Sequence, residues 1–378
     1  MRITVVNRRK LAVLAFCSVL FSGGGIAAPV YSIDNQPLKG QMVAQSQADL
    51  CTVAQGTLAY LNKGNSYDPQ VIVPGLVSRF GVDMARIKQT LSYVCQVQAE
   101  DTKAGRASRL ADPAFIRKNF EMIRWMPDKQ QSAQFAAKKP LLQNIPDDKI
   151  LLTKYYIKLA KGSAVKTAKT PHALYGIPVD EQDLTLEQAD AKKDSLIRYR
   201  YTKQQVLTGI LDKNHWAKPL IWLSRDALED TLMQGTVKID ADDGSSRFFN
   251  VHRNNGIGYQ RGLKKRQQKR YWYFKQTPGV LGYGKDANYK IPIHPMVTVA
   301  GDLQHLGLGK LVMLTHNGQS RLAVLADTGG AFENNQYQLD YLGGFFSNWK
   351  DYINTYRTFP DYFAARILVV RNSTNNEE

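Results

Sequence analysis

The chain has 378 residues, with 50 lysines and arginines against 33 aspartates and glutamates, and a formal net charge of +17 at pH 7. Its hydrophobic share of 43% excludes a chain without material for a core. The length allows two domains. The charge indicates a polyanionic partner, either a nucleic acid or a surface such as a cell wall or membrane.

Residues 1–28 have the pattern of a cleaved signal peptide. Four basic residues precede an apolar run of 11, LAVLAFCSVLF, and SGGGIAA supplies a cleavage point near Ala27 or Ala28. The run is too short to span a membrane. The bulky Phe16 before Cys17 argues against a lipoprotein, and NRRKLA leaves twin-arginine export open beside the general route. We therefore expect an exported protein, periplasmic or associated with the outer membrane, and export favours a wall or membrane surface over nucleic acid.

The next segment, 46–100, has apolar residues at the three- and four-residue spacing of helices, and Asp83 is placed to cap the second of them. Cys51 and Cys95 lie on these two segments. In an oxidising compartment an isolated pair indicates one disulfide, with two buried free thiols as the alternative. Two thiols cannot build a zinc site alone, no histidines are grouped beside them, and no metal is expected.

Residues 112–126 predict a third helix, because Asp112-Pro113 suits an N-cap followed by proline in the first turn. After about residue 148 the helical spacing of apolar residues ends, and in 149–162 apolar and polar residues alternate as in a strand. A helix capped by Thr202 follows, and 218–240 reads as strand, helix and strand.

From residue 271 onward strand patterns dominate, and Asn317-Gly318 between two apolar runs predicts a hairpin. Just before, 261–275 packs seven basic residues beside four consecutive aromatics. Three interpretations stay open for this segment: an exposed turn entering a strand, attraction to an anionic wall, or stacking on nucleic acid bases.

Three aspartates follow strand-like runs, Asp302 after MVTVAG, Asp327 after RLAVLA, and Asp340 within YQLDYLGG. Strand ends of a small barrel lie close together, so the three carboxylates could converge, and repulsion then keeps one of them protonated to higher pH. A protonated carboxylic acid is the general acid that cleavage of a glycosidic bond needs. The alternative is ordinary turn chemistry, since aspartate before glycine is common in turns.

The same stretch, VAGDLQHLGLGKLVML and RLAVLADTGGAFENNQYQLDYLGG, resembles the three-aspartate domain of the MltA-type membrane-bound lytic murein transglycosylases. The upstream stretch LLTKYYIKLAKG and the segment ending in Gln234-Gly235-Thr236 are similar to further blocks of that family. The resemblance covers about 150–370. The loop between Asp327 and Asp340 is longer than in the family pattern.

The resemblance implies an α+β, mainly β fold. A six-stranded double-psi β-barrel would carry a helical N-terminal part and an inserted second β-rich domain, with a groove between the two. The implied ranges are 1–28 for the signal peptide, 29–175 for the helical part and first barrel strands, 176–270 for the inserted domain, 271–370 for the barrel and 371–378 for a disordered tail.

The resemblance also implies an activity, cleavage of the β-1,4 bond between N-acetylmuramic acid and N-acetylglucosamine in peptidoglycan, leaving a 1,6-anhydro end. Asp340 would be the acid and then the base, supported by Asp327 and Asp302, with no cofactor. The implied substrate-binding residues are Tyr155, Tyr156, Gln234, Thr236, Thr328, Gly329 and Gly330.

The expected partner is the glycan strand, bound by a monomer, and peripheral association with cell-wall machinery or a membrane stays open. The main alternative is a non-catalytic peptidoglycan-binding or scaffold protein on the same fold, in which the longer loop displaces Asp340. A basic secreted protein that binds nucleic acid or a surface is the third hypothesis.

Overall fold

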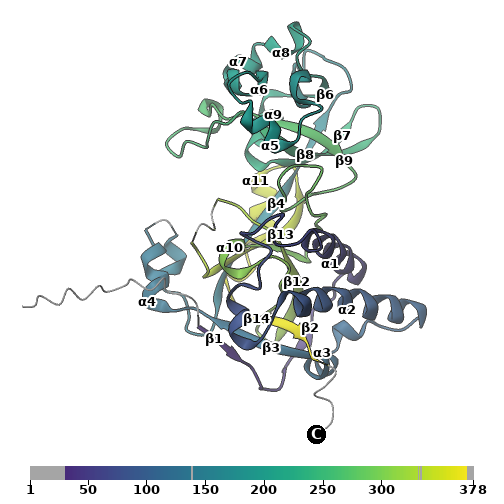
Figure 1. The fold of residues 1–378 in the computed structure, drawn as a ribbon, viewed down its shortest axis with the longest axis vertical. Helices are drawn as coiled ribbons and strands as arrows, with labels where there is room; N and C mark the ends of the chain where they lie inside the picture. Colours follow the sequence, from purple (N-terminus) through teal and green to yellow (C-terminus); the bar gives the residue numbers. More distant parts are fainter. Residues whose placement is uncertain (1–29, 138, 331, 333, 373–378) are drawn as a thin grey trace, which may run out of the picture.

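The computed structural model describes residues 30–372 except 138, 331 and 333. The predicted signal peptide and the tail from 373 onward lie outside this range. Figure 1 shows two parts stacked along the long axis, one with helices α1–α3 and the other with helices α5–α9. Each part has its own hydrophobic core. None of the helices in the described part of the chain is long and apolar enough to cross a membrane.

The first core is built from the helices α1–α3, from β3 (Phe120–Met126) and from a ring of six paired strands. These are β4 (Ile150–Gly162), β10 (Thr298–Ala300), β11 (Leu311–His316), β12 (Gln319–Asp327), β13 (Gln338–Phe346) and β14 (Tyr362–Val370). They pair in the order β14, β11, β12, β10, β13, β4, and β4 pairs again with β14, which closes the ring. Most side chains of β10, β11 and β12 are buried, as expected where both faces of a strand are covered.

Helices α1 (Gln47–Leu61) and α2 (Met84–Lys103) pack on this ring, as their apolar spacing predicts. Ser46 caps the first helix and Asp83 the second, each accepting a hydrogen bond from a backbone N–H of the first turn. A disulfide between Cys51 and Cys95 joins the two helices. Strands β1 (Val30–Ile33), β2 (Gln41–Met42) and β3 (Phe120–Met126) extend the sheet beyond the ring.

The helix predicted over 112–126 is confirmed only for its first half. Asp112 caps α3 with Pro113 in its first turn, but α3 ends at Asn119 and the chain continues as β3. Strand β3 lies between β1 and β14, and its Phe120, Met122 and Trp125 are buried there. The backbone partners on both sides decide the conformation of this ambiguous apolar run.

The second part contains β5 (His172–Tyr175), β6 (Pro219–Leu223), β7 (Thr236–Ala241), β8 (Ser246–Asn254) and β9 (Trp272–Thr277). Its helices are α5 (Leu186–Ala191), α6 (Ile197–Arg200), α7 (Lys203–Leu207), α8 (Ile210–Lys213) and α9 (Arg225–Gln234). The part is therefore mixed rather than mainly β. Its core includes side chains of β5 and β9, so it extends past both ends of the range 176–270. The proposed domain limits stay a prediction.

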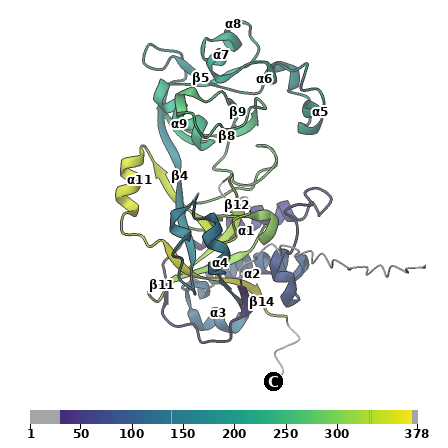
Figure 2. The same ribbon diagram turned by 90° about the vertical axis from the view of Figure 1, so that its left-hand side faces the viewer.

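Strand β4 connects the two parts, and Figures 1 and 2 show it running from one into the other. Its first half pairs with β13 and β14, and its last five residues pair with β7. The strand predicted over 149–162 is thus confirmed, as are the Thr202 cap of α7 and the hairpin, whose turn residues Asn317 and Gly318 both have positive φ. The remaining short helices are α4 (Lys129–Ser132), α10 (Leu303–Leu306) and α11 (Trp349–Tyr356).

Candidate active site

A cavity of about 470 Å³ lies between the two parts. One wall comes from the strand ring, where Asp327, the 328–330 segment and Asp340 line it. The opposite wall comes from the second part, through the 234–236 turn and Trp272. The middle of β4 passes along the cavity and contributes Tyr155, Tyr156 and Ile157. Every predicted site residue of the glycan groove except Asp302 therefore lines one cavity.

Asp340 lies on β13 between two neighbouring strands, opposite Ala300 of β10 and Thr153 of β4. Its Oδ1 is buried and has no hydrogen-bond partner among the described residues. Burial raises the pKa of Asp340 to about 7, a rise that the Thr153 hydroxyl and the Lys139 cation oppose and the Asp327 charge assists. Asp340 is thus a carboxyl group that keeps its proton near neutral pH, lines the cavity, and has one oxygen without a hydrogen-bond partner among the described residues.

Asp327 ends β12, and Ala300 of β10 is its register partner as well. Since Ala300 is paired with both aspartates, they lie two strands apart, roughly 10 Å between backbones. Both Asp327 oxygens are used, because the Tyr155 hydroxyl donates to Oδ2 at 2.8 Å and the Thr328 N–H donates to Oδ1 at 2.9 Å. Burial raises the pKa of Asp327 to about 6, against these bonds and the Lys290 cation.

The two carboxylates consequently differ in what they can do. Asp327 is held in place by two donors and ionises at lower pH, whereas Asp340 has an unengaged oxygen and ionises later. Pairs of acids whose surroundings separate their pKa values in this way are suited to separate acid and electrostatic roles.

Asp302 is not brought to this cavity. It caps the short helix α10, accepting from the His305 N–H at 3.3 Å and pairing with the His305 ring at 2.8 Å. It is buried, with 4% exposure, and lines a smaller neighbouring cavity of about 190 Å³ that shares Thr328 and Gly329 with the first. The convergence of three aspartates predicted from strand ends is therefore limited to two.

The predicted glycan-contacting residues are positioned by backbone bonds and packing. The Thr328 hydroxyl donates to the Gly301 carbonyl at 2.7 Å, which fixes the 328–330 segment beside β10. Tyr156 lines the cavity, is mostly buried, and packs against Phe346 and Tyr352.

On the opposite wall, Gln234 ends α9 and Gly235 follows with φ of 81°, a left-handed conformation that favours glycine. The Thr236 hydroxyl donates to the Asn250 Oδ1 at 2.9 Å, so this turn is tied to β8. A Cβ on Gly235 would lie 3.0 Å from the Trp272 ring, which shows how closely the turn packs on that side chain.

Several lining residues of this cavity were not predicted as site residues, among them Trp272 and Lys290. The Arg270 guanidinium lies 3.8 Å from the centre of a Trp272 ring, which fixes the indole as a flat wall. The strand alternation of 271–274 already places Trp272 on the face opposite Tyr271 and Tyr273, and this was the available signal. Lys290 lies in a loop with no recognisable pattern. Among the described residues no group of three or more His, Cys, Asp or Glu side chains is placed to hold a metal.

Comparison with known proteins gives a clear result at the level of fold. No family model matches the sequence, and no curated protein matches it. Among solved structures, a membrane-bound lytic murein transglycosylase from Agrobacterium tumefaciens is similar at 14% identity and a TM-score of 0.55, over 86% of this chain and 93% of that one. MltA from Neisseria gonorrhoeae is similar at 15% identity and a TM-score of 0.56, over 92% of this chain and 93% of that one. E. coli MltA with bound chitohexaose is similar at 15% identity and a TM-score of 0.52, over 90% of this chain and 95% of that one. The chain has the MltA-type fold.

Proposed function

We propose that this protein is a peptidoglycan lytic transglycosylase with Asp340 as its acid and base. The observation that carries the proposal is the state of Asp340, a buried carboxyl group with a pKa of about 7 and an unpartnered oxygen in the cavity between the two parts. A cavity between two parts is a common place for substrate binding. The similarity to a structure that holds chitohexaose supports a glycan as the ligand.

In the proposed reaction, protonated Asp340 donates its proton to the oxygen of the β-1,4 bond between N-acetylmuramic acid and N-acetylglucosamine. The bond from that oxygen to C1 breaks, and N-acetylglucosamine leaves as an alcohol. The Asp340 carboxylate then removes the proton from the C6 hydroxyl of the muramic acid while that oxygen bonds to C1. The product is a 1,6-anhydro end, and the acid is regenerated. The internal nucleophile replaces water, so no second base is required.

Asp327 supports this cycle in two ways. Its charge raises the pKa of Asp340, and its bond from Tyr155 holds the tyrosine ring at the cavity wall. We also propose that the ring of six strands is the double-psi β-barrel, and that 1–28, 29–175, 176–270, 271–370 and 371–378 are the functional ranges. Export, cleavage of the signal peptide and action as a monomer belong to the same proposal.

Purified murein sacculi provide the test. The native protein should release muropeptides that have the mass of the anhydro form, and Asp340→Asn should release none, because an amide cannot donate the proton. Asp148→Asn is the matched control, since Asp148 is an exposed aspartate just before β4 and outside the cavity. Sacculus binding without cleavage by the native protein would instead support the alternative, a non-catalytic wall-binding protein.

A further inference from the structure

A second cavity of about 480 Å³ lies beside the candidate active site. The two cavities share Val251, Asn254 and Lys290 as lining residues, so they are neighbours along the end of β8. We name the second one the side cavity. Its charged lining side chains are Asp190, Lys193, Arg198, Arg253, Lys285 and Lys290.

The floor of the side cavity is a buried ion network. Glu181 is fully buried and accepts hydrogen bonds from two arginines. Arg198 Nε donates to its two carboxylate oxygens, at 3.0 and 2.9 Å, and Arg253 Nη1 donates to one of them at 3.0 Å. A second Arg198 nitrogen donates to the Asn254 carbonyl, and a second Arg253 nitrogen to the Leu184 carbonyl at 2.7 Å. Guanidinium groups held by several hydrogen bonds each are rigid, so the floor is preorganised.

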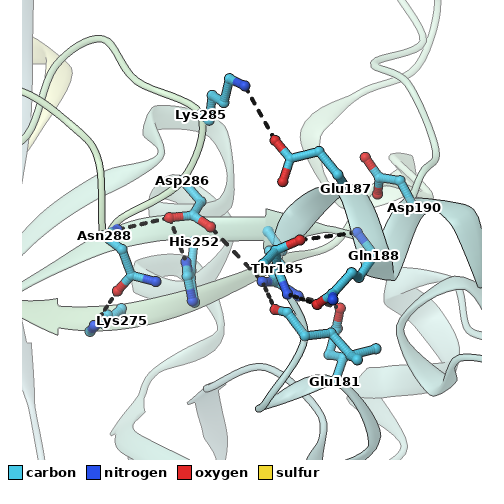
Figure 3. A network of polar contacts seen from close by, with 12 residues as sticks. Glu181, Thr185, Glu187, Gln188, Asp190, His252, Lys275, Lys285, Asp286 and Asn288 are labelled. Carbon is cyan, nitrogen blue, oxygen red and sulfur yellow. Dashed lines mark hydrogen bonds and ion pairs between the residues drawn. The ribbon is translucent and has the colours of Figure 1, made fainter. Parts of the chain in front are cut away.

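Two polar atoms of this floor lack a partner. Arg253 Nε and His252 Nδ1 are buried and have no hydrogen-bond partner within the described ranges, on side chains with 5% and 8% exposure. Figure 3 shows Asp286 beside His252, but the distance between His252 Nδ1 and the carboxylate is 3.8 Å. The Asn288 N–H donates to the same Asp286 oxygen at 2.9 Å. A buried donor without an acceptor destabilises the fold, and an acceptor on a ligand would remove that cost.

The cations around the cavity are only partly neutralised. Lys285 pairs with Glu187 at 3.2 Å, and Asp190 pairs with Arg198 at 3.2 Å. Lys193 is exposed at the rim. Lys290 lies at the junction with the active site, where the charges of Asp327 and Asp286 act on it. The cavity thus combines the exposed ammonium group of Lys193 with unsatisfied buried nitrogens, and this set suits carboxylate and amide groups.

Resting on the proposed function, we propose that the side cavity binds the carboxylates of the stem peptide carried by N-acetylmuramic acid, so that the protein prefers peptide-bearing glycan to stripped glycan. The stem peptide branches from the lactyl ether of the sugar next to the bond that is cleaved. A cavity that adjoins the active site through Lys290 lies where such a branch would go. Lys193 and Arg253 would receive the peptide's carboxylates and carbonyls.

The test measures binding rather than cleavage. Asp340→Asn protein is titrated calorimetrically with the disaccharide tetrapeptide of peptidoglycan and with the same disaccharide without its peptide. The tetrapeptide should bind about tenfold more tightly. Adding Lys193→Met should remove most of that difference, whereas Lys192→Met, an exposed neighbour that does not line the cavity, should leave it unchanged.

Three outcomes decide the matter. Equal affinity for the two ligands overturns the proposal. An effect of Lys193→Met that is equal for both ligands also overturns it, because Lys193 would then act on the disaccharide that both ligands share and not on the peptide. Peptide preference that depends on Lys193 supports it. If the native protein shows this preference but releases no anhydro product, the proposed activity is refuted. The assignment of the side cavity as a binding site for the stem peptide then still holds.

Discussion

Lys310 offers a quantitative test of the electrostatics inside the strand ring. The residue precedes β11, has 2% exposure, and donates a hydrogen bond only to the Leu308 carbonyl, at 3.3 Å, among the described groups. No carboxylate of the described chain pairs with it. Burial therefore lowers its pKa from 10.5 to about 7. Lys310→Met keeps the chain length and removes the ionisable group.

The magnitude follows from proton linkage. The folded pKa lies below the unfolded one, so between about pH 7 and pH 10.5 the unfolded chain binds more protons, and stability rises with pH in that window. At about 1.4 kcal/mol per unit, the Lys310 contribution to the free energy of unfolding rises by about 3 kcal/mol from about pH 6 to about pH 9. Lys310→Met should therefore be more stable than the native chain at pH 6, and its advantage should shrink by that amount at pH 9.

Urea unfolding of both proteins, with the disulfide intact, at several pH values gives the difference directly. Lys350→Met, at an exposed position of α11, is the control and should show no such change with pH. A stability difference between native protein and Lys310→Met that stays constant from pH 6 to pH 9 would refute the reasoning, because the ammonium would then be solvated or paired when folded.

Two further predictions concern the candidate active site. First, kcat/KM on sacculi should fall about tenfold per unit as the pH rises above about 7, because Asp340 must be protonated to act as the acid. Asp327→Asn removes a charge that raises the pKa of Asp340, so the fall should begin at lower pH, and an unshifted profile would contradict the coupling. Second, Gly235→Ala should cost about 1–2 kcal/mol of stability, since alanine is strained at positive φ. It should also push Trp272 aside and weaken glycan binding, measurable by calorimetry with Gly262→Ala, at an exposed loop position without close neighbours, as control.

The sequence predicts the elements around the site well, because they depend on local rules. Asp83 and Thr202 cap helices through bonds to the next few backbone N–H groups, and Asn317-Gly318 turns the hairpin through its own φ angles. The MltA-type fold also follows from several short blocks in the right order, and the solved structures agree with it. The switch from α3 to β3 at Phe120 was missed, because it depends on pairing with β1 and β14, far away in the chain.

The site shows the same division between local and distant causes. Asp327 and Asp340 were placed correctly in one cavity because each is held by its own strand register, with Ala300 paired to both. Their difference in ionisation could not be read from the sequence, since it depends on Tyr155 reaching Asp327 from β4, 172 residues away. Lys290 was missed for a related reason, because only the packing of its loop against both parts brings it to the junction of the two cavities.

Asp302 shows why a strand end alone does not identify a catalytic carboxylate. Whereas Asp327 is itself the last residue of β12, Asp302 follows the end of β10 by two residues. Its oxygens, however, have a nearer use, because the chain turns directly into α10 and both His305 nitrogens in reach, backbone and ring, bind them. A carboxylate satisfied within its own turn is not available to a ligand, whereas Asp340, in the middle of a strand, has no backbone donor left to take its Oδ1. Asp340, whose Oδ1 has no hydrogen-bond partner among the described residues, is therefore the first residue to substitute.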